Sequence, residues 1–337
     1  MPYAPPESLL VVRGAEVTEQ IDGNREACLA AVRAAYLAHA RGDSALPHSS
    51  FLRFPGRERD RIIALPAYLG GGFDVAGVKW IASFPENVRH GLQRASAVLV
   101  LNDVETGFPY ACLESSVISA SRTAASAALA AQELIGARRA ERVGFVGTGL
   151  IADHIRRFLM ELGWGIGGFR LFDLDHAAAE RFSRALREDD MPDVKVVDDV
   201  REAFSACDLV ILATVAGTPH IDDPAVLRHA PTVLHVSLRD LDPSLIAAAQ
   251  NVTDDVDHVM REGTSLHLAE ERFGHRDFVD GTLVDVLEGR FTRDPGRAVV
   301  FSPFGLGVLD LAVGKWVHDS VAERGGGSPV PGFFPAS

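Results

Sequence analysis

The fold of this chain is restricted most by one segment, residues 142–173, which reads RVGFVGTGLIADHIRRFLMELGWGIGGFRLFD. Residues 143–146 are a short apolar run with β-branched side chains, typical of a buried parallel strand. Gly147 and Gly149 follow in a G-x-G-x-x-A motif, then a helical pattern, and then a second apolar run that ends at Asp173. This order of strand, glycine turn, helix, strand and acid predicts a dinucleotide-binding unit.

Each part of this motif has a physical role in binding a dinucleotide. Gly147 permits a tight turn, Gly149 lets the backbone approach a pyrophosphate, and N–H groups at the helix start face the phosphates. Asp173 lies 24 residues after Gly149, near the offset of about 20 expected for the acid that accepts from the ribose hydroxyls. Its carboxylate repels a 2′-phosphate, which favours NAD over NADP. The predicted cofactor contacts in the motif are Gly147, Thr148, Gly149, Leu150, Ile151 and Asp173.

A lone G-x-G-x-x-A also occurs in ordinary glycine turns, and it is the surrounding strands, helix and acid that favour a cofactor site here.

Composition and charge limit the kinds of partner that the chain can bind. The 337 residues are 47% hydrophobic and 23% charged, as in an ordinary globular protein with room for two domains. The net charge of −13 argues against non-specific binding to nucleic acid or to an anionic membrane.

Cysteine usage and hydropathy bear on the compartment. The three cysteines are scattered without metal-ligand spacing, so we expect no metal site and a reducing, cytoplasmic setting. Residues 1–8 lack the features of a signal peptide, and the alanine-rich residues 124–131 are too short and polar to span a bilayer.

The order of elements predicts two kinds of domain. The first third is rich in strands without alternating helices, with apolar runs at 51–54, 62–65, 75–84, 96–102 and 108–113. A long helix over 115–135 then bridges to the alternating strands and helices that follow the glycine turn. We therefore predict an α/β fold: a Rossmann-type doubly wound parallel sheet plus a strand-rich α+β domain. A final helix at 308–321 should pack on the first domain, and residues 325–337 should form a flexible tail.

Ligands of doubly wound sheets bind beyond the carboxyl ends of the strands. The candidates there are Asp173, Thr214 with Gly217, and the segments 237–240 and 301–307. Asp240 follows an apolar strand and is a candidate for catalysis. The alternative for Asp240 is a helix N-cap, although Asp242 is better placed for that cap.

Two basic residues stand out because their surroundings are apolar. Lys79 lies within a strand pattern, and alternation leaves open whether it faces solvent or a site. Arg122 is the one charge between Glu114 and Glu133 in a helix suited to close packing. A buried Arg needs an anionic partner, which is either an internal carboxylate or the carboxylate of a ligand.

Longer segments resemble a known enzyme family. Residues 101–134, 142–152 and 301–318, the last reading FSPFGLGVLDLAVGKWVH, are similar to the ornithine cyclodeaminase/μ-crystallin family over nearly the whole chain. Residues 52–71 and 77–87 (LRFPGRERDRIIALPAYLGG and GVKWIASFPEN) most resemble one branch. That branch makes 2,3-diaminopropionate for siderophores and peptide antibiotics, and its members are N-(2-amino-2-carboxyethyl)-L-glutamate dehydrogenases.

The resemblance implies an organisation and a set of roles. It implies a homodimer, a substrate-binding and dimerisation domain at 1–120 and 309–337, and an NAD-binding domain at 121–308. It places the substrate lysine on Lys79, the carboxylate-binding arginine on Arg122 and the catalytic aspartate on Asp240. The further cofactor contacts expected are Thr123, Thr214 and Ser237.

One departure from the family pattern affects the substrate. Many members carry Arg in a P-x-R segment where this chain has Pro47-His48-Ser49, and Arg53 is the candidate for that role. The departure favours the diaminopropionate branch over ornithine and simple ketimine substrates. Such a substrate has three carboxylates, so several cations are expected around it: Arg122, Lys79, Arg53 and Arg239.

The reaction implied is an oxidation followed by hydrolysis. NAD takes hydride from the glutamate Cα, Asp240 activates water against the imine, and Lys79 holds or shuttles a proton. The products are 2-oxoglutarate and 2,3-diaminopropionate. The alternatives are an ornithine cyclodeaminase, a ketimine reductase, and a non-catalytic protein that binds NAD and an effector.

Overall fold

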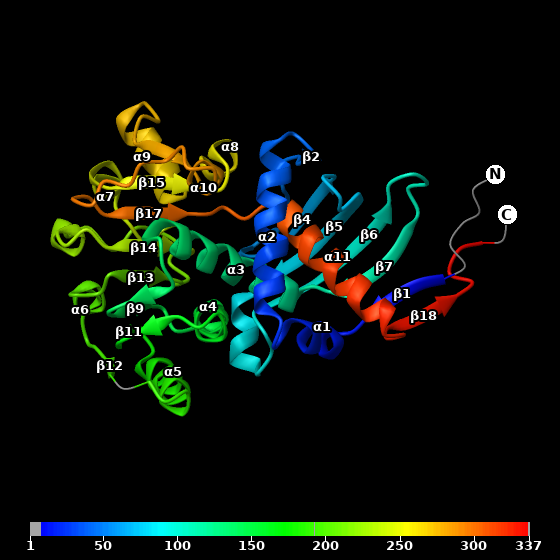
Figure 1. Cartoon of the computed structure of the whole chain (residues 1–337), viewed down its shortest axis with the longest axis horizontal. Helices are drawn as coiled ribbons and strands as arrows, with labels where there is room; N and C mark the ends of the chain where they lie inside the picture. Colours follow the sequence, from blue (N-terminus) through cyan, green and yellow to red (C-terminus); the bar gives the residue numbers. More distant parts are fainter. Residues whose placement is uncertain (1–7, 192, 336–337) are drawn as a thin grey trace. The chain divides into compact units, whose positions relative to one another are not determined.

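The computed structural model describes residues 8–191 and 193–335, and the chain divides into two compact units. The first takes in the chain up to Arg122 and again from Leu306 onward, and the second is Thr123–Gly305. The division falls within α3 (Ser116–Ile135), so the helix predicted over 115–135 connects the units as expected. Figure 1 traces both units in the order of the sequence.

The described part of the first unit is built on an eight-stranded sheet with the order β18-β1-β7-β6-β5-β4-β2, in which β3 pairs with β4. All the pairings are antiparallel except β1 with β7. The strands predicted at 51–54 and 62–65 are confirmed as the antiparallel pair β3 and β4. The elements are β1 (Ser8–Val12), α1 (Gly14–Ile21), α2 (Arg25–Ala40), β2 (Ser44–Ala45), β3 (Ser50–Phe54), β4 (Arg57–Leu69), β5 (Val75–Ser83), the 3₁₀ helix η1 (Pro85–His90), β6 (Ala95–Asp103), β7 (Pro109–Glu114), α11 (Gly307–Glu323) and β18 (Ser328–Pro331).

One face of this sheet is covered by α11, which lies across β4, β5 and β6 and also packs against α2 (Figure 1). The covered face carries Leu65, Lys79 and Leu99, which are cross-strand neighbours. The approach is close: a Cβ added to Gly314 of α11 would stand 2.2 Å from Cδ2 of Leu99. Alternation therefore directs Lys79 into the core of the unit, which decides between the two directions open from the sequence.

The opposite face of the sheet retains exposed apolar side chains. Trp80 and Val98 are direct cross-strand partners, 42% and 41% exposed. Leu52 and Tyr68 lie on the same face by the same alternation and are 46% and 37% exposed. Contiguous exposed apolar surface of this kind is typical of an interaction face.

The flexible tail predicted at residues 325–337 is wrong for part of its length. Residues 328–331 form β18, which pairs antiparallel with β1 and adds an edge strand to the sheet. The N–H of Gly327 also donates to Oε1 of Glu16, 2.7 Å away. Glycine and proline are typical of coil, but an edge strand tolerates proline because one side of it needs no ladder hydrogen bonds.

The second unit contains a wholly parallel eight-stranded sheet in the order β12-β11-β9-β13-β14-β17-β15-β16, which confirms the predicted Rossmann-type fold. From β9 the strands β11 and β12 are added on one side, and the next strand, β13, is added on the other side of β9, so the strand order reverses between β9 and β13. The strands are β8 (Arg139–Ala140), β9 (Val143–Val146), β10 (Gly165–Ile166), β11 (Phe169–Phe172), β12 (Val194–Val196), β13 (Leu209–Leu212), β14 (Thr232–His235), β15 (Gln250–Thr253), β16 (Val279–Thr282) and β17 (Val299–Ser302), of which β8 and β10 form a separate pair.

Helices connect these strands as the alternating pattern predicts. They are α4 (Leu150–Glu161), α5 (His176–Glu188), α6 (Val200–Phe204), the 3₁₀ helix η2 (Pro224–Leu227), α7 (Pro243–Ala248), α8 (Val256–Val259), α9 (Ser265–Phe273) and α10 (Leu283–Leu287). The central strands β9, β13, β14 and β17 are buried along their whole length, as parallel strands covered on both faces are. Within the described ranges, no helix has the length and apolar composition that crossing a bilayer requires.

Candidate active site

The glycine turn that precedes α4 leaves unoccupied space beside the first residues of the helix. Gly147 follows β9 with φ of +85°, and a Cβ on it would stand 2.7 Å from the carbonyl oxygen of Ala213. Both the left-handed backbone and the close approach require glycine here. A Cβ built on Gly149, by contrast, meets nothing within 4 Å, and no side chain caps the helix that begins at Leu150. The turn thus has the space and the N–H donors that a pyrophosphate needs.

Asp173 is bonded to this turn. Its Oδ2 accepts hydrogen bonds from the N–H of Thr148 at 2.7 Å and from the Thr148 hydroxyl at 2.9 Å. Its Oδ1 accepts from the N–H of Asp175 at 2.9 Å. The acid at the end of β11 therefore lies beside the glycine turn of β9, the position from which a carboxylate reaches an adenosine ribose.

On the other side of the strand-order reversal, a second group of polar residues gathers around Asp240. Its Oδ1 accepts from the hydroxyl of Thr214 and from Nε2 of His220, 3.0 Å away. Nε2 of His235 lies 3.2 Å from Oδ2, and the Ser237 hydroxyl donates to the same oxygen. Three of the residues that sequence analysis named, Thr214, Ser237 and Asp240, are thus brought together at the carboxyl ends of β13 and β14.

The environment of Asp240 keeps its carboxylate ionised. The residue has no exposed surface, and burial alone would raise its pKa. The hydrogen bonds from His220 and Ser237, together with the nearby ring of His235, outweigh burial and hold the pKa of Asp240 well below its ordinary value. Because the carboxylate is buried, it reaches a ligand only through the groups bonded to it. The alternative role as a helix N-cap belongs to Asp242, whose side chain accepts from the N–H of Ser244.

In the first unit, Lys79 and Arg122 share one buried carboxylate. Nζ of Lys79 lies 2.7 Å from Oδ2 of Asp310, and Nε of Arg122 lies 3.1 Å from Oδ1. Nζ of Lys79 also donates to the hydroxyl of Ser119 at 3.1 Å. The side chains of Lys79, Arg122 and Asp310 are 2%, 11% and 1% exposed. Arg122 therefore has an internal carboxylate as a partner, which is one of the two kinds of partner that the sequence left open.

The cluster has more positive than negative groups, and the pKa of its lysine is lowered. Burial lowers the pKa of Lys79 to about 8, since the charge of Asp310 restores only part of what desolvation removes and Arg122 lowers it further. Two cations share one carboxylate, so the cluster carries a net positive charge at neutral pH. A cluster with a net positive charge favours the binding of an additional anion. Because the pKa of Lys79 is near neutrality, its amine can both give up and take up a proton at physiological pH.

The remaining predicted residues lie apart from these groups. Arg53 is on the same sheet face as Lys79 but is exposed, and it lies four residues along and two strands across the sheet, roughly 16 Å away. Its guanidinium stacks over the ring of Phe51. Arg239 donates from Nε and Nη2 to the carbonyl oxygen of Glu262. Thr123 is half-buried on α3, in the first position of the second unit.

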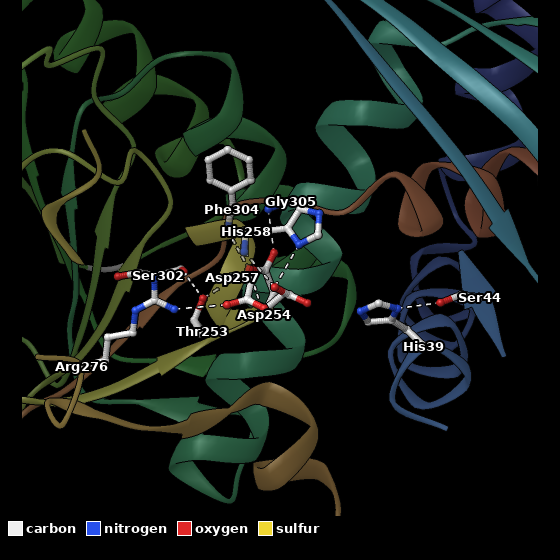
Figure 2. Close-up of polar contacts among 11 residues, drawn as sticks. His39, Ser44, Thr253, Asp254, Asp257, His258, Arg276, Ser302, Phe304 and Gly305 are labelled. Carbon is white, nitrogen blue, oxygen red and sulfur yellow. Dashed lines mark hydrogen bonds and ion pairs between the residues drawn. The ribbon is translucent and has the colours of Figure 1, made fainter. Parts of the chain in front are cut away.

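The loop at 301–307, another candidate from the sequence, is held by Asp254. Figure 2 shows this carboxylate pointing at the backbone of Phe304 and Gly305, whose N–H groups donate at 2.9 and 2.6 Å. Oδ1 also accepts from the N–H of Asp255. Burial raises the pKa of Asp254 against the effect of these three donors. Asp254 thus holds the backbone of the last residues of the second unit through hydrogen bonds within that unit.

Sequence reasoning missed Asp310, His220 and His235. Asp310 had a usable signal, since it is the one charge in the apolar run 306–314, and a buried acid implies a buried cation just as Arg122 implies an acid. His235 ends a strand that is otherwise apolar or β-branched. His220 gave no signal of its own, because its importance depends on the bond to Asp240, 20 residues away in sequence.

Comparison with known proteins places these features in a family. The family model described as ornithine cyclodeaminase/mu-crystallin matches residues 10–325. The N-((2S)-2-amino-2-carboxyethyl)-L-glutamate dehydrogenase of Staphylococcus aureus is 28% identical, over 93% of this chain and 95% of that protein. The alanine dehydrogenase of Archaeoglobus fulgidus is also 28% identical, over 90% and 92%. A solved archaeal alanine dehydrogenase dimer with bound NAD superposes with a TM-score of 0.85 at 26% identity, covering 97% of this chain and all of that one.

We predict that Asp173 sets the choice between the two dinucleotides. Changing Asp173→Asn should lower the ratio of the Kd for NADP to the Kd for NAD by about tenfold or more, because like charges roughly 4 Å apart near a protein surface repel by a few kcal/mol. Fluorescence titration with both reduced cofactors measures the ratio. Asp175→Asn, which removes the same charge two residues on and keeps a good N-cap, is the matched control. An equal change in both variants would contradict the prediction.

We predict that the Lys79 amine loses its proton near pH 8. The chain has only three lysines, so NMR of protein labelled at lysine Cε resolves each one. One signal should titrate with a midpoint of about 8, charged below that pH and neutral above it. Asp310→Asn should lower the midpoint further, because the carboxylate favours the ammonium form. Lys195→Arg and Lys315→Arg identify the other two signals, and three midpoints near the ordinary value of about 10.4 would contradict the prediction.

Proposed function

The chain belongs to the ornithine cyclodeaminase/mu-crystallin family, and from that premise we propose that it catalyses the NAD-dependent oxidative hydrolysis of N-(2-amino-2-carboxyethyl)-L-glutamate. It is an NAD-dependent oxidoreductase that acts on CH–NH groups, as are the dehydrogenases to which it is similar. The products of the proposed reaction are 2-oxoglutarate and 2,3-diaminopropionate. The latter would feed the synthesis of a siderophore or a peptide antibiotic in the cytoplasm, where the unpaired thiols of the three cysteines are stable.

The observation that carries the proposal is the net positive cluster of Lys79, Arg122 and Asp310. A tricarboxylate substrate needs cations that are not fully neutralised by the protein, and here two cations share one acid. The planar guanidinium of Arg122 is suited to a substrate carboxylate, because its fork of donors matches two oxygens. Lys79, with its lowered pKa, is suited to hold or release a proton beside the reacting amine.

In the second unit, the glycine turn and Asp173 would hold the dinucleotide. The N–H groups at the start of α4 would bind its pyrophosphate, and Asp173 would accept from a ribose hydroxyl. When bound, NAD supplies an acceptor for the hydride that leaves the substrate carbon. Thr214 and Ser237 lie at the ends of β13 and β14, where the nicotinamide half of a dinucleotide binds in this fold.

Hydrolysis of the imine would depend on Asp240 and the side chains bonded to it. The ionised carboxylate places a negative charge near a carbon that is positively charged as the imine forms. The same network orients the group that takes a proton from water. A general base in this position contributes about 10²- to 10⁴-fold to the rate.

We predict that purified protein and NAD convert N-(2-amino-2-carboxyethyl)-L-glutamate into equimolar NADH, 2-oxoglutarate and 2,3-diaminopropionate, measured by absorbance and mass spectrometry. Arg122→Ala should lower kcat/KM by about 10- to 100-fold through loss of a charged hydrogen bond, with Arg139→Ala, an exposed arginine, as the control. Conversion of ornithine with ammonia release and no net NADH would instead identify a cyclodeaminase. Binding of NAD without turnover of any amino acid or imine would identify a non-catalytic protein.

We further propose that the chain forms a homodimer through the exposed face of the first unit's sheet. The support is the apolar surface of Leu52, Tyr68, Trp80 and Val98, which a second copy would cover. Light scattering should give twice the mass of one chain for the wild type. Trp80→Glu should give the monomer mass, because a charge buried in such an interface is costly. Leu92→Glu, an equally drastic change at an exposed position outside the sheet, should stay dimeric, and a dimeric Trp80→Glu would contradict the proposal.

A further inference from the structure

The carboxylate of Asp240 is fully buried, and both of its oxygens are bonded to neighbouring side chains. An ionised carboxylate offers about four acceptor positions, two on each oxygen. Thr214 and His220 occupy Oδ1, and the Ser237 hydroxyl donates to Oδ2. Nε2 of His235, which accepts from the backbone N–H of Asp240 at 3.1 Å, lies 3.2 Å from Oδ2 and covers it. The residue is 0% exposed, so the carboxylate cannot take a proton from a bound molecule directly.

His220 is the member of this network that reaches the surface. Its side chain is 39% exposed, whereas that of Asp240 is 0% exposed. An ionised carboxylate only accepts hydrogen bonds, so the contact at 3.0 Å requires the proton of the neutral His220 ring to be on Nε2. Nδ1 then carries a lone pair. The bond to Asp240 thus leaves the second nitrogen of the ring as a base.

The backbone around His220 is fixed to the same part of the chain. The N–H groups of His220 and Ile221 both donate to the carbonyl oxygen of Asp240 at 2.9 Å, and the N–H of Asp242 donates back to Ile221. Ile221 forms a parallel bridge with Leu241 and is buried. The position of the ring is therefore fixed both by hydrogen bonds of the backbone and by the contact of Nε2 with Asp240.

The position of His220 in the fold matches the hydride-transfer half of a dinucleotide site. Its partners Thr214 and Ser237 follow the carboxyl ends of β13 and β14, and β13 is the direct neighbour of β9, which ends at Gly147. Dinucleotides bind across the reversal of strand order between β9 and β13, with the adenosine on the β11 side. The ring of His220 therefore belongs to the side where the nicotinamide binds.

We propose that Nδ1 of His220 takes up and returns the proton during hydrolysis of the imine, and that Asp240 is the positioning residue that sets the tautomer and orientation of the ring. This inference rests on the proposed function, in that it needs a substrate with a CH–NH group. The division of labour is that of any histidine base oriented by a buried carboxylate.

The substrate amine R₂CH–NH–R′ loses hydride, with NAD⁺ as the oxidant, and becomes the iminium R₂C=NH⁺–R′. Water adds to the carbon as its proton passes to Nδ1 of His220, so a C–O bond forms and the C=N bond becomes single. The proton then moves from Nδ1 to the nitrogen, the C–N bond breaks and the hydroxyl proton is released. The oxygen of water ends in the keto acid, and the nitrogen leaves as the free amine R′NH₂.

The test compares four variants with the wild type in steady-state kinetics. His220→Gln keeps an N–H that reaches Asp240 but has no basic nitrogen, so kcat should fall about 10²- to 10⁴-fold with KM little changed. The kcat of Asp240→Asn should fall by a similar factor. The kcat of the double variant should be within about threefold of that of the slower single variant, because the two residues act as one unit. His275→Gln, an exposed histidine of the same unit, should match the wild type. Binding of NADH and the melting temperature show that each variant is folded.

Rescue gives a second readout that a structural role would not move. Added imidazole should restore turnover to His220→Ala, whose vacated position is open to solvent, and should not restore Asp240→Asn. A His220→Gln enzyme with wild-type kcat beside an inactive Asp240→Asn would overturn the proposal. If the wild type oxidises alanine or cyclises ornithine instead, the proposed substrate is wrong and the same variants test His220 on that substrate. A wild type that converts none of these substrates overturns the proposed function and this inference together.

Discussion

The carboxylate of Asp310 holds together three parts of the chain that are far apart in sequence. It bonds Lys79 of β5 and Arg122 of α3 while lying on α11 itself. Each of these charges would be costly alone in an apolar environment, and removing one partner from a buried pair typically costs about 3–5 kcal/mol. The return of α11 to the first unit is therefore coupled to the cluster, because the sheet face that the helix covers contains a lysine that needs its acid.

Both units bury a carboxylate, and the two surroundings differ in kind. Asp310 is neutralised by cations, which leaves the cluster positive and suited to bind an anion. Asp240 accepts from two hydroxyl groups and from the imidazole of His220, which keep it negative without supplying a fixed positive charge. Buried charge is a poor source of stability, since its desolvation offsets most of the attraction. The proposed chemistry at a CH–NH group would use both: a cation for the carboxylate of the substrate and an anion for the developing positive carbon.

The sequence predicted the second unit more completely than the first. Its glycine turn, its acid at Asp173 and its alternating strands are local patterns, and each of them has one structural meaning in a parallel sheet. The first unit was harder, because strands pair across long separations. The pattern around Lys79 was equally consistent with solvent and with the interior, and the glycine- and proline-rich segment that forms β18 was predicted as coil. In both cases the deciding partner, α11 or β1, lies more than two hundred residues away in sequence.

Sequence by itself determined the family, the dinucleotide-binding fold and the residue types on which the proposed chemistry rests, because these depend on short-range patterns and on the fixed geometry of the strand–turn–helix unit. Tertiary structure alone decided which charges meet. It paired Arg122 and Lys79 with Asp310, and it buried Asp240 behind His220, a histidine that no local pattern distinguished. The physical reason is that a buried charge selects its partner by distance in space, and only the packing of α11 on the sheet and of β13 beside β14 sets those distances.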